Sequence, residues 1–145
     1  MVSSWIGYIG IHIARNLQPE QLYNFAKLPA CESTNYNPYE YGSSMHYPAD
    51  AFMASGASEL PMIPYDFNYI VTMGSLSVSF YDVKTINDHY KCTEICGCRG
   101  PRCYNGGEPN PRNCDVCNCP EGYAGDFCTE RKVNATAESY GIYKG

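Results

Sequence analysis

Histidine side chains are the first candidates for chemistry in this chain, because imidazole binds zinc and exchanges protons near neutral pH. The three histidines are His12, His46 and His89, and neighbouring ones are separated by more than thirty residues. A zinc-binding helix needs two ligands four residues apart, and no His-Glu-x-x-His occurs in the chain. We therefore expect His12 and His46 to be structural, and the chain by itself to bind no zinc.

Cysteine is the second candidate. Cys31 stands alone, whereas the other eight of the nine cysteines lie between Cys92 and Cys128. The pair Cys114-x2-Cys117 has the spacing of zinc ligands, but it lacks a matching second Cys-x2-Cys or a nearby histidine pair. So short and cysteine-dense a segment is typical of a disulfide-stapled module, since it cannot bury a sufficient apolar core. Disulfides persist in oxidising compartments, so we expect a secreted, extracellular protein.

The charge balance excludes some partners. The 145 residues carry a formal net charge of −5, with a pI of about 5.1. Nucleic acid and anionic membrane surfaces attract clustered lysine and arginine, so we expect neither as a partner. No apolar run is long enough to span a bilayer. Because no signal peptide opens a chain that needs disulfides, we expect Met1 to begin a fragment or a truncated gene model.

Few regular elements are predicted to position these side chains. Residues 6–14 alternate in the manner of a strand, and residues 29–50, rich in Pro, Asn, Ser and Tyr, indicate an ordered loop. Ser79 is a good N-cap and Asp82 follows three residues later, which predicts a helix that ends near Cys92. One face of that helix carries Phe80, Val83, Ile86 or Asn87, and Tyr90. The expected class is α+β, mostly loop, with one clear C-terminal helix.

The segment Pro38–Tyr47 has the most specific pattern in the chain, Pro-Tyr-Glu-Tyr-Gly-Ser-Ser-Met-His-Tyr. It resembles the Met-turn of astacin-type zinc metalloproteases, usually written Pro-Tyr-Asp-Tyr-x-Ser-[Ile/Val]-Met-His-Tyr. Flanking motifs agree with that family in order and spacing, from Tyr8-Ile9 to the ending Tyr90-x-Cys92. The resemblance covers residues 6–92 as the C-terminal subdomain of a metzincin.

This resemblance implies zinc-dependent endopeptidase chemistry on extracellular protein or peptide substrates. In the family, three histidines of His-Glu-x-x-His-x-x-Gly-x-x-His hold the zinc and the glutamate is the general base. That helix would lie just before Met1. By resemblance, Met45 forms the apolar floor beneath the metal, and Tyr47 is a switch ligand that leaves zinc to stabilise the oxyanion. Cys92 matches the cysteine that bonds to the missing N-terminal half of the domain.

Residues 94–129 resemble an EGF-like domain, through the run Cys103-Tyr-Asn-Gly-Gly and the ending from Cys119 to Cys128. The spacing of six cysteines alone leaves fifteen connectivities open. The resemblance implies the pairs Cys98–Cys114, Cys103–Cys117 and Cys119–Cys128, with Cys96 as an alternative to Cys98. Calcium-binding modules carry acidic and amide residues before their first cysteine. Residues 93–95 match that pattern poorly, so we expect no calcium.

We therefore interpret residues 1–93 as the C-terminal part of an astacin-like peptidase domain, residues 94–129 as an EGF-like domain, and residues 130–145 as a polar tail. The tail contains a glycosylation sequon at Asn134. The predicted function is zinc metalloendopeptidase, with the chain inactive alone because it lacks the metal ligands. The alternative is a non-catalytic, secreted binding or decoy module that acts through its EGF-like part. The pairing of Cys31, Cys92 and Cys96 is left open.

Overall fold

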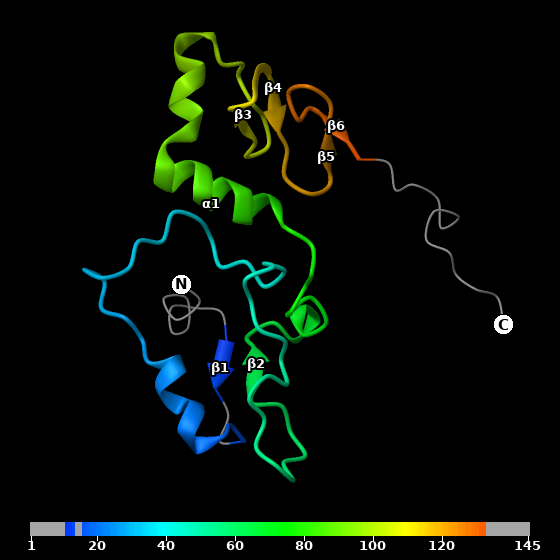
Figure 1. The fold of residues 1–145 in the computed structure, drawn as a ribbon. Helices are drawn as coiled ribbons and strands as arrows, with labels where there is room; N and C mark the ends of the chain where they lie inside the picture. Colours follow the sequence, from blue (N-terminus) through cyan, green and yellow to red (C-terminus); the bar gives the residue numbers. More distant parts are fainter. Residues whose placement is uncertain (1–10, 14–15, 133–145) are drawn as a thin grey trace, which may run out of the picture. The chain divides into compact units, whose positions relative to one another are not determined.

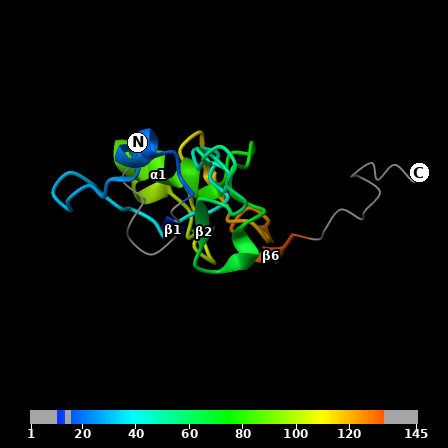
Figure 2. The same cartoon turned by 90° about the horizontal axis from the view of Figure 1, so that it is seen from below.

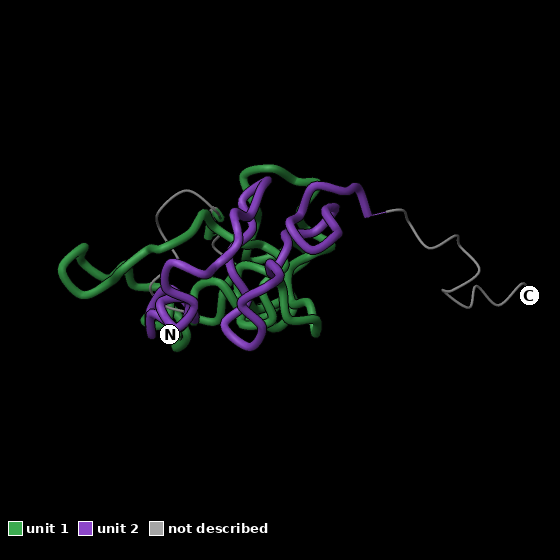
Figure 3. Tube along the Cα trace, turned by 90° about the horizontal axis from the view of Figure 1, so that it is seen from above, with its two compact units in different colours: residues 1–86 green, residues 87–145 purple. Residues whose placement is uncertain are grey.

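The computed structural model describes residues 11–13 and 16–132. The chain divides into two compact units, residues 1–86 and residues 87–145, which are coloured separately in Figure 3. The division falls inside helix α1, ahead of residue 93, where the change in composition lies. The elements of the described residues (Figure 1) are, in chain order, β1 (Ile11–Ile13), η2 (Pro19–Phe25), β2 (Met62–Pro64), η3 (Phe67–Tyr69), α1 (Phe80–Tyr90), η4 (Cys92–Arg99), β3 (Glu108–Asn110), β4 (Asn113–Asn118), β5 (Tyr123–Ala124) and β6 (Glu130–Arg131).

A two-stranded antiparallel sheet of β1 and β2 forms the centre of the first unit. Ile11 pairs with Pro64 and Ile13 pairs with Met62, so segments far apart in the sequence lie side by side (Figure 2). Strand β1 falls within the strand predicted at residues 6–14, whose remaining residues lie outside the described ones. The buried core of the unit gathers around this sheet and consists of Ile11, Leu17, Phe25, Ala49, Met62 and Met73.

Much of the first unit consists of turns and irregular segments, as the sequence predicts. The loop of residues 29–50 contains turns and bends but no helix or strand. An exception to this irregularity is the 3-10 helix η2. Pro19 occupies the first turn of that helix, where its fixed φ costs nothing, and Phe25 at the end is buried in the core.

Helix α1 lies where the sequence predicts it. It ends at Tyr90, and the next residue, Lys91, has a φ of 54° in the left-handed region. On the predicted face, Val83, Ile86 and Tyr90 are exposed, and Asn87, the stated alternative to Ile86, is the buried residue of the helix at 6% exposure. Asn87 can be buried because its side-chain amide donates a hydrogen bond of 2.5 Å to the Glu108 carboxylate. Among the described residues, no helix has the length and apolar character needed to cross a membrane.

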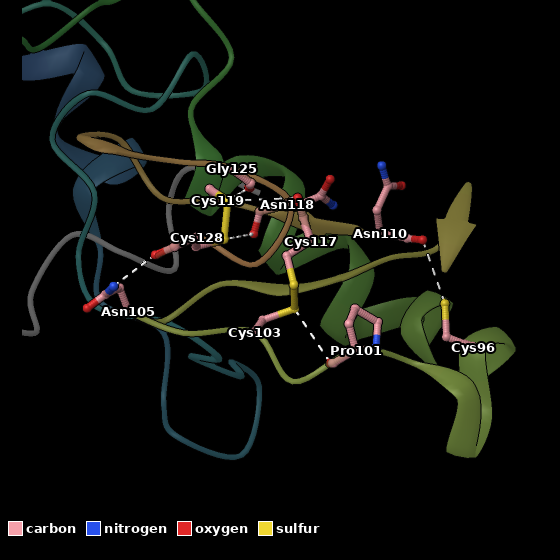
Figure 4. The surroundings of a disulfide bond; sticks show 10 residues. All are labelled: Cys96, Pro101, Cys103, Asn105, Asn110, Cys117, Asn118, Cys119, Gly125 and Cys128. Atoms are coloured by element: carbon pink, nitrogen blue, oxygen red, sulfur yellow. Dashed lines mark hydrogen bonds between the residues drawn. A yellow bond between two sulfur atoms is a disulfide. The ribbon is translucent and has the colours of Figure 1, made fainter. Parts of the chain in front are cut away.

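Three disulfides hold the second unit together. They join Cys96 to Cys114, Cys103 to Cys117 and Cys119 to Cys128. Figure 4 shows the last two bonds beside the turn at Asn105, whose side-chain amide donates to the Cys128 carbonyl at 2.8 Å. Between the bonds lie two small antiparallel ladders, β3 with β4 and β5 with β6. Covalent links replace an apolar core here, as expected for so short a segment.

The first disulfide corrects the predicted pair Cys98–Cys114. Cys96 is 2% exposed and its Cα lies 5.3 Å from that of Cys114, well within disulfide range. Gly97 separates the two candidate cysteines with φ 50° and ψ −141°, a conformation that glycine adopts without strain. This turn leaves Cys98 exposed with a free thiol. Sequence spacing could not separate the two candidates because they are two residues apart.

We predict that Cys96→Ser destabilises the second unit by about 2–5 kcal/mol, the usual cost of removing a native disulfide from a small domain. The matched variant Cys98→Ser removes an exposed thiol and leaves the free energy of unfolding nearly unchanged. Chemical unfolding of both variants, with disulfide mapping by mass spectrometry, checks the expectation. A Cys98–Cys114 link in the native protein, or equal destabilisation by both substitutions, would contradict it.

Candidate functional site

The candidate site is the Met-turn segment, residues 38–47, which folds as two successive turns. The Ser43 amide donates to the Glu40 carbonyl at 3.4 Å, and the His46 amide donates to the Ser43 carbonyl at 3.0 Å. Two side chains also bond the local backbone: the Glu40 carboxylate accepts from the Gly42 amide at 2.8 Å, and the Ser43 hydroxyl accepts from the Met45 amide at 3.1 Å. Short polar side chains thus satisfy backbone groups that regular structure does not reach.

The Asp82 carboxylate connects this segment to the first turn of helix α1. On the helix side, Asp82 accepts from the Ser79 amide at 2.9 Å, while its own amide donates to the Ser79 hydroxyl at 3.1 Å. This is a reciprocal capping box with aspartate in place of glutamate. On the loop side, Asp82 accepts from the Ser43 hydroxyl, from the Ser44 amide at 3.0 Å and from the Ser44 hydroxyl at 3.2 Å. Burial raises the pKa of Asp82, but these hydrogen bonds outweigh it and the net pKa is lowered.

His46 is held on both sides of its ring. Its Nδ1 lies 2.6 Å from the Tyr47 carbonyl oxygen, and its Nε2 lies 2.6 Å from the Tyr39 hydroxyl. Because a carbonyl only accepts, Nδ1 must carry the proton, and Nε2 then accepts from the hydroxyl of Tyr39. Burial lowers the pKa of His46 although the Tyr47 carbonyl acts against this, and burial also raises the pKa of Tyr39. The pair is therefore a neutral imidazole and a neutral phenol, and His46 is structural.

Tyr47 and Met45 are both exposed. Met45 is 61% exposed and Tyr47 is 42% exposed. The Tyr47 ring packs edge-on against Phe52 at a centroid distance of 4.9 Å, and Phe52 packs against the buried Phe25 at 5.9 Å. One face of the tyrosine ring is thus anchored to the core while part of the side chain is accessible. A phenol placed in this way can donate a hydrogen bond to a ligand.

A second support lies directly after Tyr47. Gly74 has a φ of 79°, and a Cβ placed on it would come within 2.6 Å of the Pro48 Cβ. Only glycine permits this backbone to approach Pro48 so closely. Pro48, which directly follows the Met-turn segment, is therefore packed against the backbone at Gly74. Met73, the residue before Gly74, is buried in the core.

The described residues do not make a complete zinc site. They contain no group of three His, Cys, Asp or Glu side chains that could hold a metal ion. Both ring nitrogens of His46 are already bonded, and the His12 side chain lies outside what the structure describes. Tyr47 offers one oxygen, which is too few for a four-coordinate metal. Zinc therefore does not fit the residues that the structure describes.

The remaining predicted positions fall in separate places. Cys31, Cys92 and Cys98 carry free thiols in the structure; Cys31 and Cys98 are exposed, and Cys92 is half-buried. Asn134 lies outside the described residues. Sequence reasoning recognised Asp82 only as a helix cap and missed its bonds to Ser43 and Ser44. The signal was weak, since two serines in a polar loop do not identify a partner 38 or 39 residues away.

Comparison with known proteins identifies the class to which this fold and segment belong. Residues 7–91 match the family model described as Astacin, a peptidase family. This match covers more than half of the 145 residues, so the chain belongs to the astacin family and the predicted resemblance is confirmed.

Proteins similar to this chain include zinc metalloproteinases of Caenorhabditis elegans. The chain is 46% identical to zinc metalloproteinase nas-25 over 121 residues, which are 82% of this chain and 30% of the relative. It is 44% identical to nas-31 over 126 residues, 86% of this chain and 20% of the relative. Among solved structures, a hatching-enzyme zinc protease from Oryzias latipes is 32% identical with a TM-score of 0.48, over 57% of this chain and 40% of that one. The chain spans less than a third of the length of these two nematode relatives.

For His46, we predict the Nδ1-protonated tautomer and an imidazole that stays neutral below its ordinary pKa of 6.5, because burial disfavours the charged ring. Imidazole nitrogen chemical shifts, followed by NMR during a pH titration, report both properties. Tyr39→Phe removes the donor to Nε2 but leaves the Tyr47 carbonyl, so it should preserve the tautomer. A ring protonated on Nε2 at neutral pH would contradict the assignment.

The lowered pKa of Asp82 predicts a pH-dependent contribution to stability. The folded value lies below the reference value of 3.8, so the contribution is complete above pH 3.8 and is lost as pH falls through the folded value. Asp82→Asn should therefore lower the free energy of unfolding near pH 6, and the difference from wild type should shrink as the pH falls below 3.8. Urea unfolding at several pH values measures it. A difference that is constant with pH would show that the charge contributes nothing.

Proposed function

We propose that this chain is the C-terminal part of an astacin-type zinc metalloendopeptidase that cleaves extracellular proteins or peptides. The observation that carries the proposal is the Met-turn segment, in which Met45, His46 and Tyr47 follow one another and are held by hydrogen bonds to Asp82, Ser43 and Tyr39. Membership of the astacin family and the zinc metalloproteinase relatives support it.

In this proposal Tyr47 acts by its phenol. Its ring is anchored on Phe52, which limits where the hydroxyl can reach, and its partial exposure leaves it accessible to substrate. A hydroxyl donor aimed at the carbonyl oxygen of a scissile peptide stabilises negative charge that develops there. Met45, which is 61% exposed, would supply an apolar surface beneath the reacting groups.

The zinc ligands and the general base come, in this proposal, from a segment that carries His-Glu-x-x-His and lies outside these 145 residues. Cys92 is the residue that we assign to a disulfide with that segment, because its thiol is free and half-buried in the structure. The isolated chain then neither retains zinc nor activates water. We expect the isolated chain to be inactive because the zinc ligands lie in another segment, and not because its Met-turn segment is altered.

For the second unit we propose an EGF-like module that binds or spaces and does not catalyse. Its six bonded cysteines pair first with third, second with fourth and fifth with sixth, and this order supports the assignment. Three disulfides in so short a segment favour an oxidising compartment and therefore a secreted protein. A non-catalytic secreted binding or decoy module remains the competing role of the isolated chain.

The first test uses the 145-residue chain itself, refolded under oxidising conditions with zinc present. We expect no stoichiometric zinc in the purified protein and no hydrolysis of a peptide library. Metal content by mass spectrometry and peptide cleavage are measured on the same sample. Bound zinc, with hydrolysis abolished by a chelator, would contradict the division of ligands and give the isolated chain an activity of its own.

The second test asks what Tyr47 contributes in a complete enzyme. In a chimera, this chain replaces the matching 121 residues of the nematode relative nas-25. We predict that Tyr47→Phe lowers kcat by roughly 100-fold with little change in KM, which is typical of removing one oxyanion donor. Tyr23→Phe alters an exposed tyrosine of η2 and should leave kcat unchanged. Equal effects of the two substitutions, in a chimera that retains zinc, would refute the role of Tyr47.

A further inference from the structure

We propose that Asp82 is a positioning residue for the Met-turn segment, and that helix α1 thereby sets the location of Tyr47. The proposal rests on the proposed function for its catalytic meaning but not for its structural content. Asp82 does not itself touch a substrate in this proposal; it acts through the backbone of Ser44 and through Ser43. A helix cap and a catalytic loop then share a single carboxylate.

The distribution of hydrogen bonds argues for a role beyond capping. A capping box needs one acceptor oxygen from the side chain, and the Ser79 amide uses it. Asp82 accepts three further hydrogen bonds, all from Ser43 and Ser44. An ionised carboxylate has about four lone-pair positions, so its accepting capacity is filled, mostly by the loop.

The hydrogen bonds from Ser43 and Ser44 to Asp82 lie close in sequence to Met45 and Tyr47. The Ser43 hydroxyl that donates to Asp82 also accepts from the Met45 amide at 3.1 Å, which makes a short relay from the carboxylate to the Met45 backbone. Two residues later comes Tyr47, and Pro48 rests against Gly74. Residues 43–48 are therefore held at both ends, and Asp82 provides the attachment at Ser43 and Ser44.

A purely capping Asp82 makes a different prediction. If its contacts with Ser43 and Ser44 were incidental, loss of the side chain would loosen the first turn of α1 and leave residues 43–47 unaffected. The substitution Ser79→Ala separates the two cases. It removes the acceptor for the Asp82 amide but keeps every bond from the carboxylate to the loop.

The decisive experiment is amide hydrogen exchange on the full 145-residue chain, read residue by residue by NMR. We expect Asp82→Ala to accelerate exchange of the Ser44 and Met45 amides by roughly tenfold or more, as for a lost hydrogen bond to a charged group. Ser79→Ala should accelerate exchange only in the first turn of α1. Asp82→Asn keeps one acceptor oxygen and should give an intermediate rate, which maintains the test if the alanine variant unfolds.

A kinetic cycle in the chimera with nas-25 then tests whether Asp82 acts through Tyr47. Asp82→Asn should lower kcat by roughly tenfold without changing KM when Tyr47 is present, and should add nothing in the Tyr47→Phe background. If Asp82 acted independently of Tyr47, Asp82→Asn would lower kcat by the same factor in both backgrounds.

Unchanged Ser44 and Met45 exchange in both Asp82 variants would overturn the proposal, and so would equal acceleration of those amides by Ser79→Ala. Additive kinetics would overturn the action through Tyr47. An inactive chimera with Asp82 intact would count against the proposed function alone, because the exchange rates already decide the coupling between Asp82 and the loop.

Discussion

The carboxylate of Asp82 accepts hydrogen bonds from the first turn of one helix and from a loop that lies far away in the sequence. That loop forms no helix or strand of its own, so its turns depend on side chains to satisfy backbone groups. Asp82 can bond the helix and the loop together because an ionised carboxylate accepts several hydrogen bonds at once. Through Ser43, whose hydroxyl also accepts from the Met45 amide, this interaction extends to the backbone of Met45.

The two units are stabilised by different physical means. The first has a small apolar core around the β1–β2 pair, supplemented by aromatic contacts such as Tyr39 with Tyr41 at 4.9 Å and Tyr41 with Tyr69 at 4.6 Å. The second buries few apolar side chains and relies on three disulfides. A segment of that size exposes too much surface for burial alone to offset the conformational entropy of folding.

The Met-turn segment carries a tyrosine and its supporting contacts, without the side chains that would hold a metal. The described residues carry the turn, the tyrosine and the support beneath them, yet they contain no set of side chains that could bind zinc. The proposed donor role of Tyr47 depends on a fixed geometry. The contacts available for this are the Tyr47–Phe52 ring contact, the approach of Pro48 to Gly74 and the hydrogen bond from Ser44 to Asp82. In the proposed enzyme, the tyrosine is positioned by this part of the fold and the metal is held by a segment outside these 145 residues.

The sequence by itself determined the features that depend on local spacing. Ser79 and Asp82 predicted helix α1, the cysteine density predicted a disulfide-held unit, and the order of residues 38–47 predicted the family. Tertiary structure decided what depends on distant partners. It selected Cys96 over Cys98, buried Asn87 against Glu108, and gave Asp82 its second role on the loop. Capping and turn preferences act between residues a few positions apart, whereas the choice among equivalent cysteines or hydrogen-bond acceptors depends on which groups the folded chain brings together.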